Sequence, residues 1–491
     1  MSSEEGGDPG LSAPRRLHPA AMLIGALKTI RRSLSAFVFP GVAFLVSQGF
    51  SVRTIVLVFF GALLVAVVAA LWGFLSWRAT TYEVTGGAFR LRQGVLQKNE
   101  RTIPLGHVQS VDTVQGVIQR LFGVVEVRIE TAGGGSAEPD AALSALSRAD
   151  AGILRREVEG FGMEPVTDET GPAILRRLST RELLIAGATS GQIGVALSLL
   201  AVFSQLFDDV FSETFARHLV ESLAPRSLGA VLLLLLVFAL VSWLLAIGGT
   251  VLSHAGFTLS RDGDFLYIKR GLLERREATI PLARIQAVRV VEGVLRQPFG
   301  LASLRVESAG YGEDAGVSTF LFPLLPRHEV QALLRDAVPE FAVEPPLNRL
   351  PRRALRRYIL RACAPALVLA AAGTLISFLA FGTALGLLAI FVLPLFALYG
   401  WLRFEDAGWM LEADRLVVRS RGLARTTAIA PRRRLQSRSV SQSPFQRRIR
   451  LATFGTEVAS GSGGTALEVT DLDAGSAEAL AWNLGPRPRP G

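Results

Sequence analysis

Arginines crowd the C-terminal part of this chain, and their spacing suggests contact with anionic groups. Between Arg415 and Thr456 the sequence contains no acidic residue. Because alternate residues of a strand share one face, the arginines of RLVVRSR would project together. Basic residues near a bilayer gain about 1 kcal/mol each from anionic lipid. The candidate contacts for lipid headgroups or a partner are Arg419, Arg421, Arg432, Arg433, Arg434, Arg438, Arg447, Arg448 and Arg450.

Three interpretations of these arginines remain open. They could contact anionic lipid headgroups, bind an acidic protein partner, or form a solvated face that only sets membrane orientation. Nucleic acid is not expected, because only Phe445 and Phe454 interleave the arginines and no stacking platform is indicated. A phosphoinositide pocket is disfavoured by Glu412 and Asp414, which precede the basic strand.

No other residue cluster suggests catalysis or metal binding. The five histidines are scattered, and Cys363 is the only cysteine, so the chain cannot form an internal disulfide. The motifs GxxxxGK[ST], HExxH and GxSxG do not occur. We therefore predict a protein that is not an enzyme and that needs no cofactor or metal.

The composition points to a membrane protein. Of 491 residues, 50% are hydrophobic and 19% are charged, with a formal net charge of +10. A spanning helix needs about 20 mostly apolar residues. Six such segments occur as three pairs, which predicts a multi-pass α-helical membrane protein with six helices in three hairpins. The pairs are 34–50 with 54–77, 182–207 with 227–250, and 358–380 with 383–402.

Arginine and lysine predict the orientation of these hairpins. Basic residues precede each hairpin, as in Arg31-Arg32, Arg176-Arg177 and Arg356-Arg357, whereas the turns inside the hairpins lack such clusters. By the positive-inside rule, the regions between hairpins and both termini are cytoplasmic. Residues 1–33 are expected to be a disordered basic tail. The expected location is the bacterial cytoplasmic membrane.

The soluble regions repeat one pattern. TIPLGHVQSVDTVQGVIQRLFG at 102–123 and TIPLARIQAVRVVEGVLRQPFG at 279–300 agree at half of their positions. A divergent, arginine-rich third copy keeps Gly422, Pro431 and Gln436. A period this long indicates duplication of whole domains. The predicted modules are 79–160, 255–340 and 405–485.

Each module is predicted to contain six or seven short antiparallel strands followed by one helix. In the second module, the Asp-Gly sequence at 262–263 predicts a hairpin turn. Pro104 and Pro281 are expected to end one strand, with Gln109 and Gln286 starting the next. Gly123 and Gly300 would allow a tight turn. The element order fits a small sandwich or barrel capped by a helix.

These repeated residues resemble those of the membrane-flanked bacterial PH-like family, and three modules in one chain are similar to its YdbS/YdbT-like members. The resemblance implies a pleckstrin-homology-like β-barrel after each membrane hairpin. The residues that carry it, with their first-copy partners, are Gly271, Ile280-Pro281, Ile285-Gln286, Gly293-Val294, Phe299-Gly300 and Arg305-Val306-Glu307.

We expect a non-enzymatic membrane scaffold whose modules bind anionic lipids or protein segments, as a homo-oligomer or with a membrane-protein partner. The resemblance implies a role in envelope stress or antimicrobial-peptide resistance. One alternative is an accessory subunit of a membrane exporter. A membrane-embedded lipid-modifying enzyme is another, which the lack of clustered histidine, aspartate or cysteine disfavours.

Overall fold

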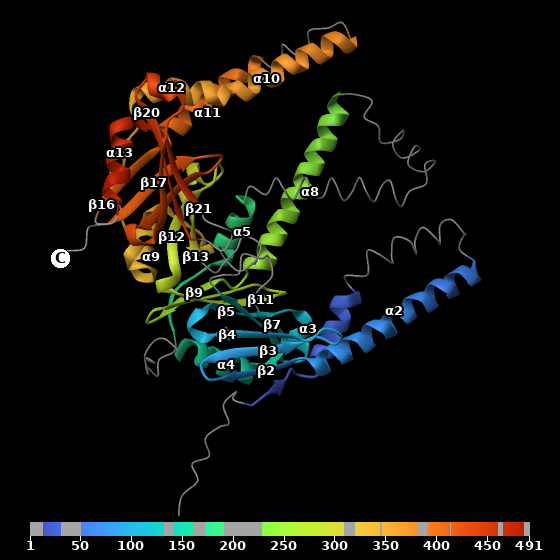
Figure 1. Ribbon diagram of the computed structural model, residues 1–491. Helices are drawn as coiled ribbons and strands as arrows, with labels where there is room; N and C mark the ends of the chain where they lie inside the picture. Colours follow the sequence, from blue (N-terminus) through green and yellow to red (C-terminus); the bar gives the residue numbers. More distant parts are fainter. Residues whose placement is uncertain are drawn as a thin grey trace, which may run out of the picture. The chain divides into compact units, whose positions relative to one another are not determined.

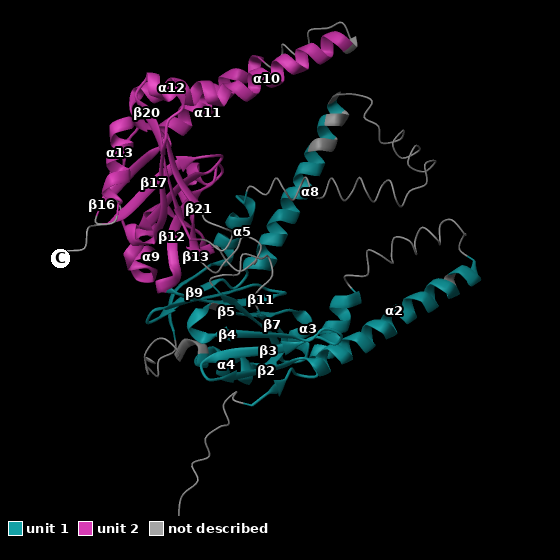
Figure 2. Cartoon of the chain, in the orientation of Figure 1, with its two compact units in different colours: residues 1–281 teal, residues 282–491 magenta. Residues whose placement is uncertain are grey.

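The computed structural model describes most of the chain, including all three modules (Figure 1). The described residues are 13–30, 51–131, 141–160, 172–190, 228–308, 320–343, 346–381, 390–412, 414–459 and 465–485. They form two compact units, residues 1–281 and residues 282–491 (Figure 2). The units are described separately below.

Every module has the same order of elements. A short strand precedes the apolar segment, and two three-stranded meanders and a helix follow it. In the first module these elements are β1 (Arg15–Arg16), β2 (Thr81–Thr85), β3 (Ala88–Gln93), β4 (Asn99–Pro104), β5 (Val108–Gln115), β6 (Val124–Thr131), β7 (Ala141–Ser147) and α4 (Arg148–Gly160). A helical turn, α3 (Val117–Leu121), joins β5 to β6.

The second and third modules repeat this order. The second contains β8 (Ala173–Arg177), β9 (Thr258–Asp262), β10 (Phe265–Arg270), β11 (Arg275–Pro281), β12 (Ile285–Glu292), η3 (Gln297–Phe299), β13 (Leu301–Ser308), β14 (Phe320–Pro326) and α9 (Val330–Ala337). The third contains β15 (Asn348–Arg349), β16 (Gly408–Glu412), β17 (Arg415–Arg421), β18 (Arg425–Pro431), η9 (Arg432–Arg434), β19 (Leu435–Ser441), α12 (Pro444–Arg448), β20 (Leu451–Val458), β21 (Thr465–Asp473) and α13 (Ala474–Asn483).

Antiparallel sheets join neighbouring modules, which the sequence did not predict. In unit 1 a seven-stranded sheet runs β7-β6-β5-β11-β10-β9-β8, so the second meander of module 1 pairs with the first meander of module 2. Unit 2 contains the equivalent sheet, β14-β13-β12-β18-β17-β16-β15. The remaining strands form a sheet β1-β2-β3-β4 in unit 1 and a sheet β19-β20-β21 in unit 2.

The core of the first module lies between its two meanders. Phe89 and Leu91 of β3 and Val127 and Ile129 of β6 are almost fully buried there, and Leu154 of α4 covers them. Alternate residues of each strand point inward, which is the pattern expected for a half-buried strand.

The N-terminal segment differs from the predicted disordered tail. Residues 13–30 are folded, with β1 paired to β2 and a helix at Ala20–Ile30. Leu17, Ala21 and Ile24 are buried in the first module's core. The prediction was wrong for residues 13–30 because the apolar residues of the Ala20–Ile30 helix are buried against the strands of the module.

The third module has its own core in unit 2. Leu416 of β17, Ala430 of β18 and Phe454 of β20 are fully buried, and Leu480 of α13 packs on them. Tyr358, near the start of a long apolar helix, belongs to the same cluster.

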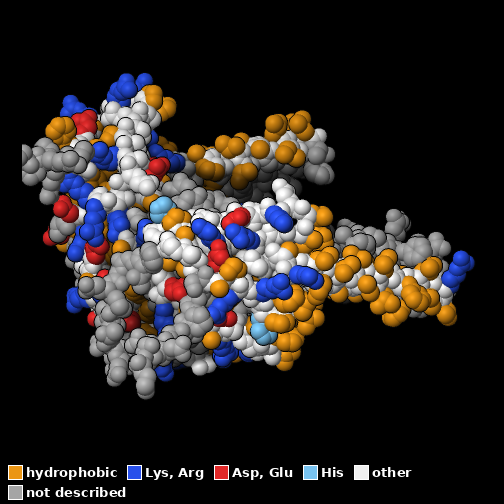
Figure 3. Space-filling view, turned by 60° about the horizontal axis from the view of Figure 1, so that its bottom comes forward, with side chains coloured by type: hydrophobic (Ala, Val, Ile, Leu, Met, Phe, Trp, Pro, Cys, Tyr) orange, Lys and Arg blue, Asp and Glu red, His pale blue; other side chains and the backbone are white. Residues whose placement is uncertain are grey.

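Three long apolar helices lead to or from the modules. These are α2 (Val52–Ala79), α8 (Leu228–His254) and α10 (Leu355–Phe381). Each is long and apolar enough to cross a membrane. Figure 3 shows hydrophobic side chains covering the parts of the molecule that project from its body. The three helices match the predicted segments 54–77, 227–250 and 358–380.

The partner segments of these hairpins are described only in part. Segment 34–50 lies outside the described residues, and 182–207 is described up to residue 190, where α5 (Thr180–Ala188) has ended. Segment 383–402 is described from residue 390, and α11 (Leu393–Asp406) begins within it and ends beyond it. Six spans are therefore not established by the described helices.

The predicted turns are confirmed. Gly263 lies between β9 and β10 with φ of 52°, and Gly123 and Gly300 have φ of 66° and 61°. In the third module Arg450 occupies the position of these last two glycines and adopts φ of 53°. The left-handed turn is thus kept even where a side chain makes it costly.

Candidate membrane-facing surface

The turn between β10 and β11 is fixed to the end of the apolar helix α8. The amides of Gly271 and Leu272 donate to the carbonyl oxygens of Ala255 and Leu252, at 2.8 and 2.9 Å. Gly271 has φ of 103°, and a Cβ there would lie 1.9 Å from the Glu274 carbonyl oxygen. Only glycine can therefore make this turn, which explains its presence in the repeat.

Apolar side chains at this turn point into solvent rather than into the module. Leu272 and Leu273 are each 52% exposed. Arg120 of α3 donates to both of their carbonyl oxygens, at 3.0 and 3.2 Å, which brings α3 beside the turn. Leu121 of α3 is 81% exposed. Unit 1 therefore has a group of exposed apolar side chains at the end of a candidate membrane span.

Unit 2 repeats this arrangement at the end of α11. Asp406, the last residue of α11, accepts from Arg421 and from Arg425 on either side of the β17–β18 turn. Leu423 in that turn is 72% exposed, and Phe299 of η3 is 73% exposed. The name "apolar tips" is used below for the exposed apolar side chains at these two turns and at the β5–β6, β12–β13 and β19–β20 connections. They are Leu121, Leu272, Leu273, Phe299, Leu423 and Phe445.

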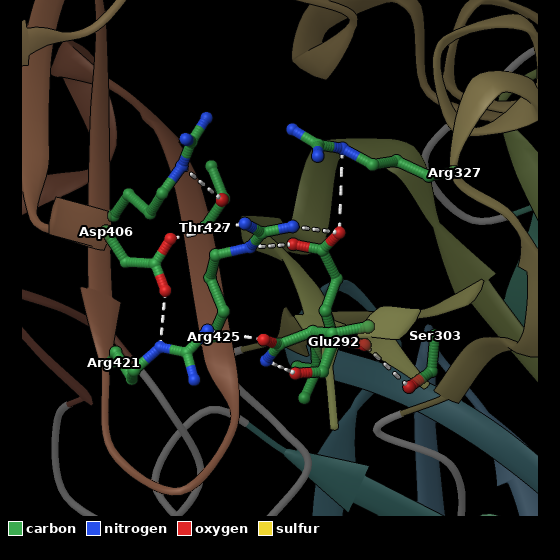
Figure 4. Close-up of polar contacts among 10 residues, drawn as sticks. Glu292, Ser303, Arg327, Asp406, Arg421, Arg425 and Thr427 are labelled. Atoms are coloured by element: carbon green, nitrogen blue, oxygen red, sulfur yellow. Dashed lines mark hydrogen bonds and ion pairs between the residues drawn. The ribbon is translucent and has the colours of Figure 1, made fainter. Parts of the chain in front are cut away.

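An ionic cluster holds the unit 2 turn (Figure 4). Arg425 makes a bidentate contact with Glu292, with Nη2 to Oε1 at 2.8 Å, and also bonds Asp406 at 3.2 Å. Arg327 lies 3.5 Å from Glu292. The hydrogen bond to Glu292 raises the pKa of Arg425. Neither Glu292 nor Asp406 was predicted from the sequence.

The third apolar tip carries exposed arginines. Phe445 of α12 is 68% exposed, and Arg447, Arg448 and Arg450 are exposed beside it. Ser443 and Gln446 form a capping box that starts this short helix. The structure thus brings together three of the predicted contact residues with an apolar side chain.

Buried Asp471 places this tip beside the start of α10. Its carboxylate accepts from Gln446 of α12 at 2.8 Å, from Arg357 at 3.0 Å and from Arg361 at 3.2 Å. Asp471 is fully buried and lies where the other copies have Ala145 and Leu324. This replacement of an apolar residue by a charge was the sequence signal that could have revealed the site.

The other predicted arginines lie elsewhere. Arg432, Arg433 and Arg434 follow the end of β18 remote from the β17–β18 turn. Arg432 contacts Asp414 and Arg433 contacts Glu340, around a groove of about 660 Å³ that Arg438 also lines. Burial lowers the pKa of Arg434, and the charge of Arg433 lowers it further.

On β17, Arg419 and Arg421 are only partly exposed. Arg419 donates to Thr427 at 3.3 Å, and burial lowers its pKa. Arg421 contacts Asp406 and Gln297. The nine predicted arginines therefore form separate groups, of which the group at α12 is the most exposed. Among the described residues no group of histidine, cysteine and carboxylates could hold a metal ion.

This architecture, three equivalent β modules joined by apolar helices, defines a transmembrane protein built from bacterial PH domains. The model of the bacterial PH domain family matches residues 33–161, 194–338 and 364–487, and the chain belongs to that family. It is similar to the transmembrane protein YdbT of Bacillus subtilis (strain 168), with 33% identity over 494 residues covering 96% of this chain and 98% of YdbT. No solved structure matches it.

Proposed function

We propose that this chain is a non-enzymatic scaffold of the bacterial cytoplasmic membrane. Its PH modules hold anionic lipid of the inner leaflet through the apolar tips and the arginines beside them. The observation that carries the proposal is the direct attachment of exposed apolar turns to the ends of apolar helices, as at Leu272 and Leu252. Side chains in that position lie at the depth of the lipid headgroups once the helix spans the bilayer.

Strand pairing supports the proposed six-span topology. Each predicted membrane hairpin follows a short strand and precedes the strand that pairs with it: β1 pairs with β2, β8 with β9 and β15 with β16. Both ends of a hairpin therefore lie on one side of the membrane, which requires an even number of crossings. Since α2, α8 and α10 are each long enough for one crossing, each hairpin needs a second. The arginine distribution supports a cytoplasmic location for the modules and both termini.

The charge beside the tips favours anionic lipid. Arg447, Arg448 and Arg450 are exposed and follow Phe445 closely in the sequence, and the segment from Phe445 to Arg450 contains no acidic residue. An apolar side chain anchors the surface in the headgroup region, and the arginines then lie within reach of phosphate groups. Such contacts contribute about 1 kcal/mol per arginine near the surface.

Fluorescence quenching in proteoliposomes tests the membrane contact. A single-cysteine full chain, Cys363→Ser with Leu273→Cys, carries a small fluorophore, and the vesicles contain spin-labelled lipid. The matched control is Asp264→Cys, at the opposite end of β10, about 20 Å away for a strand of this length. We expect strong quenching at residue 273 and little at residue 264. Equal quenching at the two positions would reject the proposed contact.

A second measurement concerns the lipid. The wild-type chain, reconstituted in nanodiscs of mixed phosphatidylglycerol and phosphatidylcholine, should retain phosphatidylglycerol preferentially. Retention should fall for Arg447→Gln/Arg448→Gln and persist for Arg433→Gln, which lies away from the tip. If Arg433→Gln also lost the preference for phosphatidylglycerol, the lipid would be attracted by the overall positive charge of the module and not by contact with the tip.

A further inference from the structure

Two strands lack a neighbour that their equivalents have. In the repeat, β5, β12 and β19 are equivalent, as are β4, β11 and β18. β5 pairs with β11 and β12 pairs with β18. Among the described strands, β19 pairs only with β20 and β4 pairs only with β3. β4 and β19 thus have, among the described strands, one edge each without a partner, and these two edges correspond to the two sides of the internal junction.

The two internal junctions have identical register. In unit 1, Arg275 lies opposite Gln115 and Arg276 opposite Val114. In unit 2, Arg425 lies opposite Glu292 and Thr426 opposite Val291. Arg275 and Arg425 are equivalent because each lies six residues before the proline that ends its strand, Pro281 or Pro431. Gln115 and Glu292 are equivalent because each lies six residues after the shared glutamine, Gln109 or Gln286. The repeat thus specifies one register, with different side chains in each junction.

Exposure follows the presence of the neighbour. β12 is buried along most of its length, whereas every residue of β19 after Leu435 is exposed. Likewise Ala428 and Ile429 of β18, which pair with β12, are buried, whereas β4 is exposed except at Ile103. Val440 is 40% exposed, whereas its equivalent Val290 is 9% exposed.

The remaining edge strands behave differently. β7, β14 and β21 are edges in all three modules, and so are β1, β8 and β15. The bulge near the start of β19 does not prevent pairing with a further strand, because β5 and β12 have the same bulge and each pairs with a strand of the next module. Within the described part of the chain, β4 and β19 are the edge strands whose equivalents are paired on both sides.

We propose that β19 of one chain pairs antiparallel with β4 of a second copy, which repeats the internal junction between molecules. Applying the repeat register places Asn99 opposite Ser441 and Glu100 opposite Val440. Arg438 then lies diagonally across from Glu100, a position from which opposite charges attract. The contact is heterologous, so copies anchored in one membrane form a ring if the rotation closes or a row if it does not. This assembly does not depend on lipid binding.

Disulfide trapping in membranes tests the proposal. Two differently tagged full chains are co-expressed on a Cys363→Ser background, one with Asn99→Cys and the other with Ser441→Cys. A second pair uses Glu100→Cys and Val440→Cys, since one of two consecutive positions is the closer, non-hydrogen-bonded pair. We expect a cross-linked product of both tags on mild oxidation. Because each chain carries one cysteine, the product is intermolecular.

The controls separate this register from random collision. Asn99→Cys with Ser437→Cys is four residues out of register and should give no product. Adding Val440→Glu opposite Glu100 should abolish the product of Asn99→Cys with Ser441→Cys, and adding Glu100→Lys should restore it. Ile174→Glu, on the edge strand β8, should leave the product unchanged. Equal products in and out of register, or none in register, would overturn the proposal.

Discussion

Units 1 and 2 contain the same seven-stranded sheet, joined in the same register, but different side chains stabilise the central junction. In unit 1 the strands β5 and β11 meet with Gln115 opposite Arg275, and Gln115 bonds the Val124 carbonyl oxygen within its own module. In unit 2 the equivalent pair is Glu292 and Arg425, an ion pair extended by Asp406.

The difference shows which part of the junction the fold needs. Main-chain pairing is common to both units and sets the register, since both junctions have an arginine at this position but only unit 2 has a carboxylate opposite it. The ionic cluster of unit 2 is an addition that also secures the end of α11. A buried ion pair is sensitive to loss of one partner, because the other is left uncompensated. Unit 2 should therefore depend on its junction side chains far more than unit 1 does.

The largest expected effect is that of Arg425→Met. This change leaves buried Glu292 and partly buried Asp406 without their shared cation, although Arg421 still contacts Asp406, and we expect a loss of about 3 kcal/mol in local stability. Arg327, 3.5 Å from Glu292, compensates only in part. Hydrogen exchange of β12 and β18 in the full chain measures the effect. Exposed Arg275→Met in unit 1 is the matched control and should change β5 and β11 by about 0.5 kcal/mol or less. Equal effects in both units would contradict the comparison.

A smaller effect is expected at the anchor of α10. Asp471→Asn weakens the charge-assisted bonds to Arg357 and Arg361, and we expect a loss of about 2 kcal/mol. The control Asp473→Asn removes an ion pair with Arg353 whose two side chains are nearly half exposed, so its effect should be small. Amide hydrogen exchange in the first turns of α10 and along β21 measures the difference in stability between the two variants. An unchanged anchor in Asp471→Asn would show that apolar packing around Tyr358 is sufficient.

The smallest effect concerns the corresponding anchor of unit 1 and its pH dependence. Burial tends to raise the pKa of Glu126, but Lys28 and Arg128 outweigh it, and the net pKa lies below the ordinary 4.5. A lowered carboxyl pKa contributes stability that is present above the ordinary value and is lost as the pH falls through the folded-state pKa. At pH 7, Glu126→Gln should cost about 1 kcal/mol.

The thermal midpoint checks this pH dependence. The difference between wild type and Glu126→Gln should shrink as the pH is lowered below 4.5, the ordinary glutamate value. Glu100→Gln removes an exposed pair with Arg92 and serves as the control, with little effect at any pH. A difference that stays constant with pH would show that the ion pair with Lys28 is not the cause.

Much of the fold could be predicted from repetition in the sequence. The aligned phrases at 102–123 and 279–300 located the strands, and the left-handed turns followed from Gly123 and Gly300. The helix after each module was predicted from apolar spacing such as Val330, Leu333 and Leu334, which are buried. Local patterns suffice here because strand alternation and turn geometry depend on neighbours in the chain.

The candidate site could be predicted only in part. The arginine-rich segment was evident, but composition could not separate Arg447 and Arg448, exposed beside Phe445, from Arg433, which contacts Glu340. The apolar tips were also missed as a surface. Leu121 and Phe299 lie in the repeated phrase, and an apolar residue in such a phrase is ordinarily assigned to the core.

The sequence by itself determined the three modules, their strands and turns, and the apolar segments that precede them, because each of these depends on residues close in the chain. Tertiary structure alone decided that modules share sheets, since Gln115 and Arg275, or Glu292 and Arg425, are far apart in sequence and no local pattern selects their pairing. It also decided which strands remain edges. β12 is buried beside β18, whereas β19, which has serine and arginine at most of the equivalent positions, has no such neighbour among the described strands and is exposed.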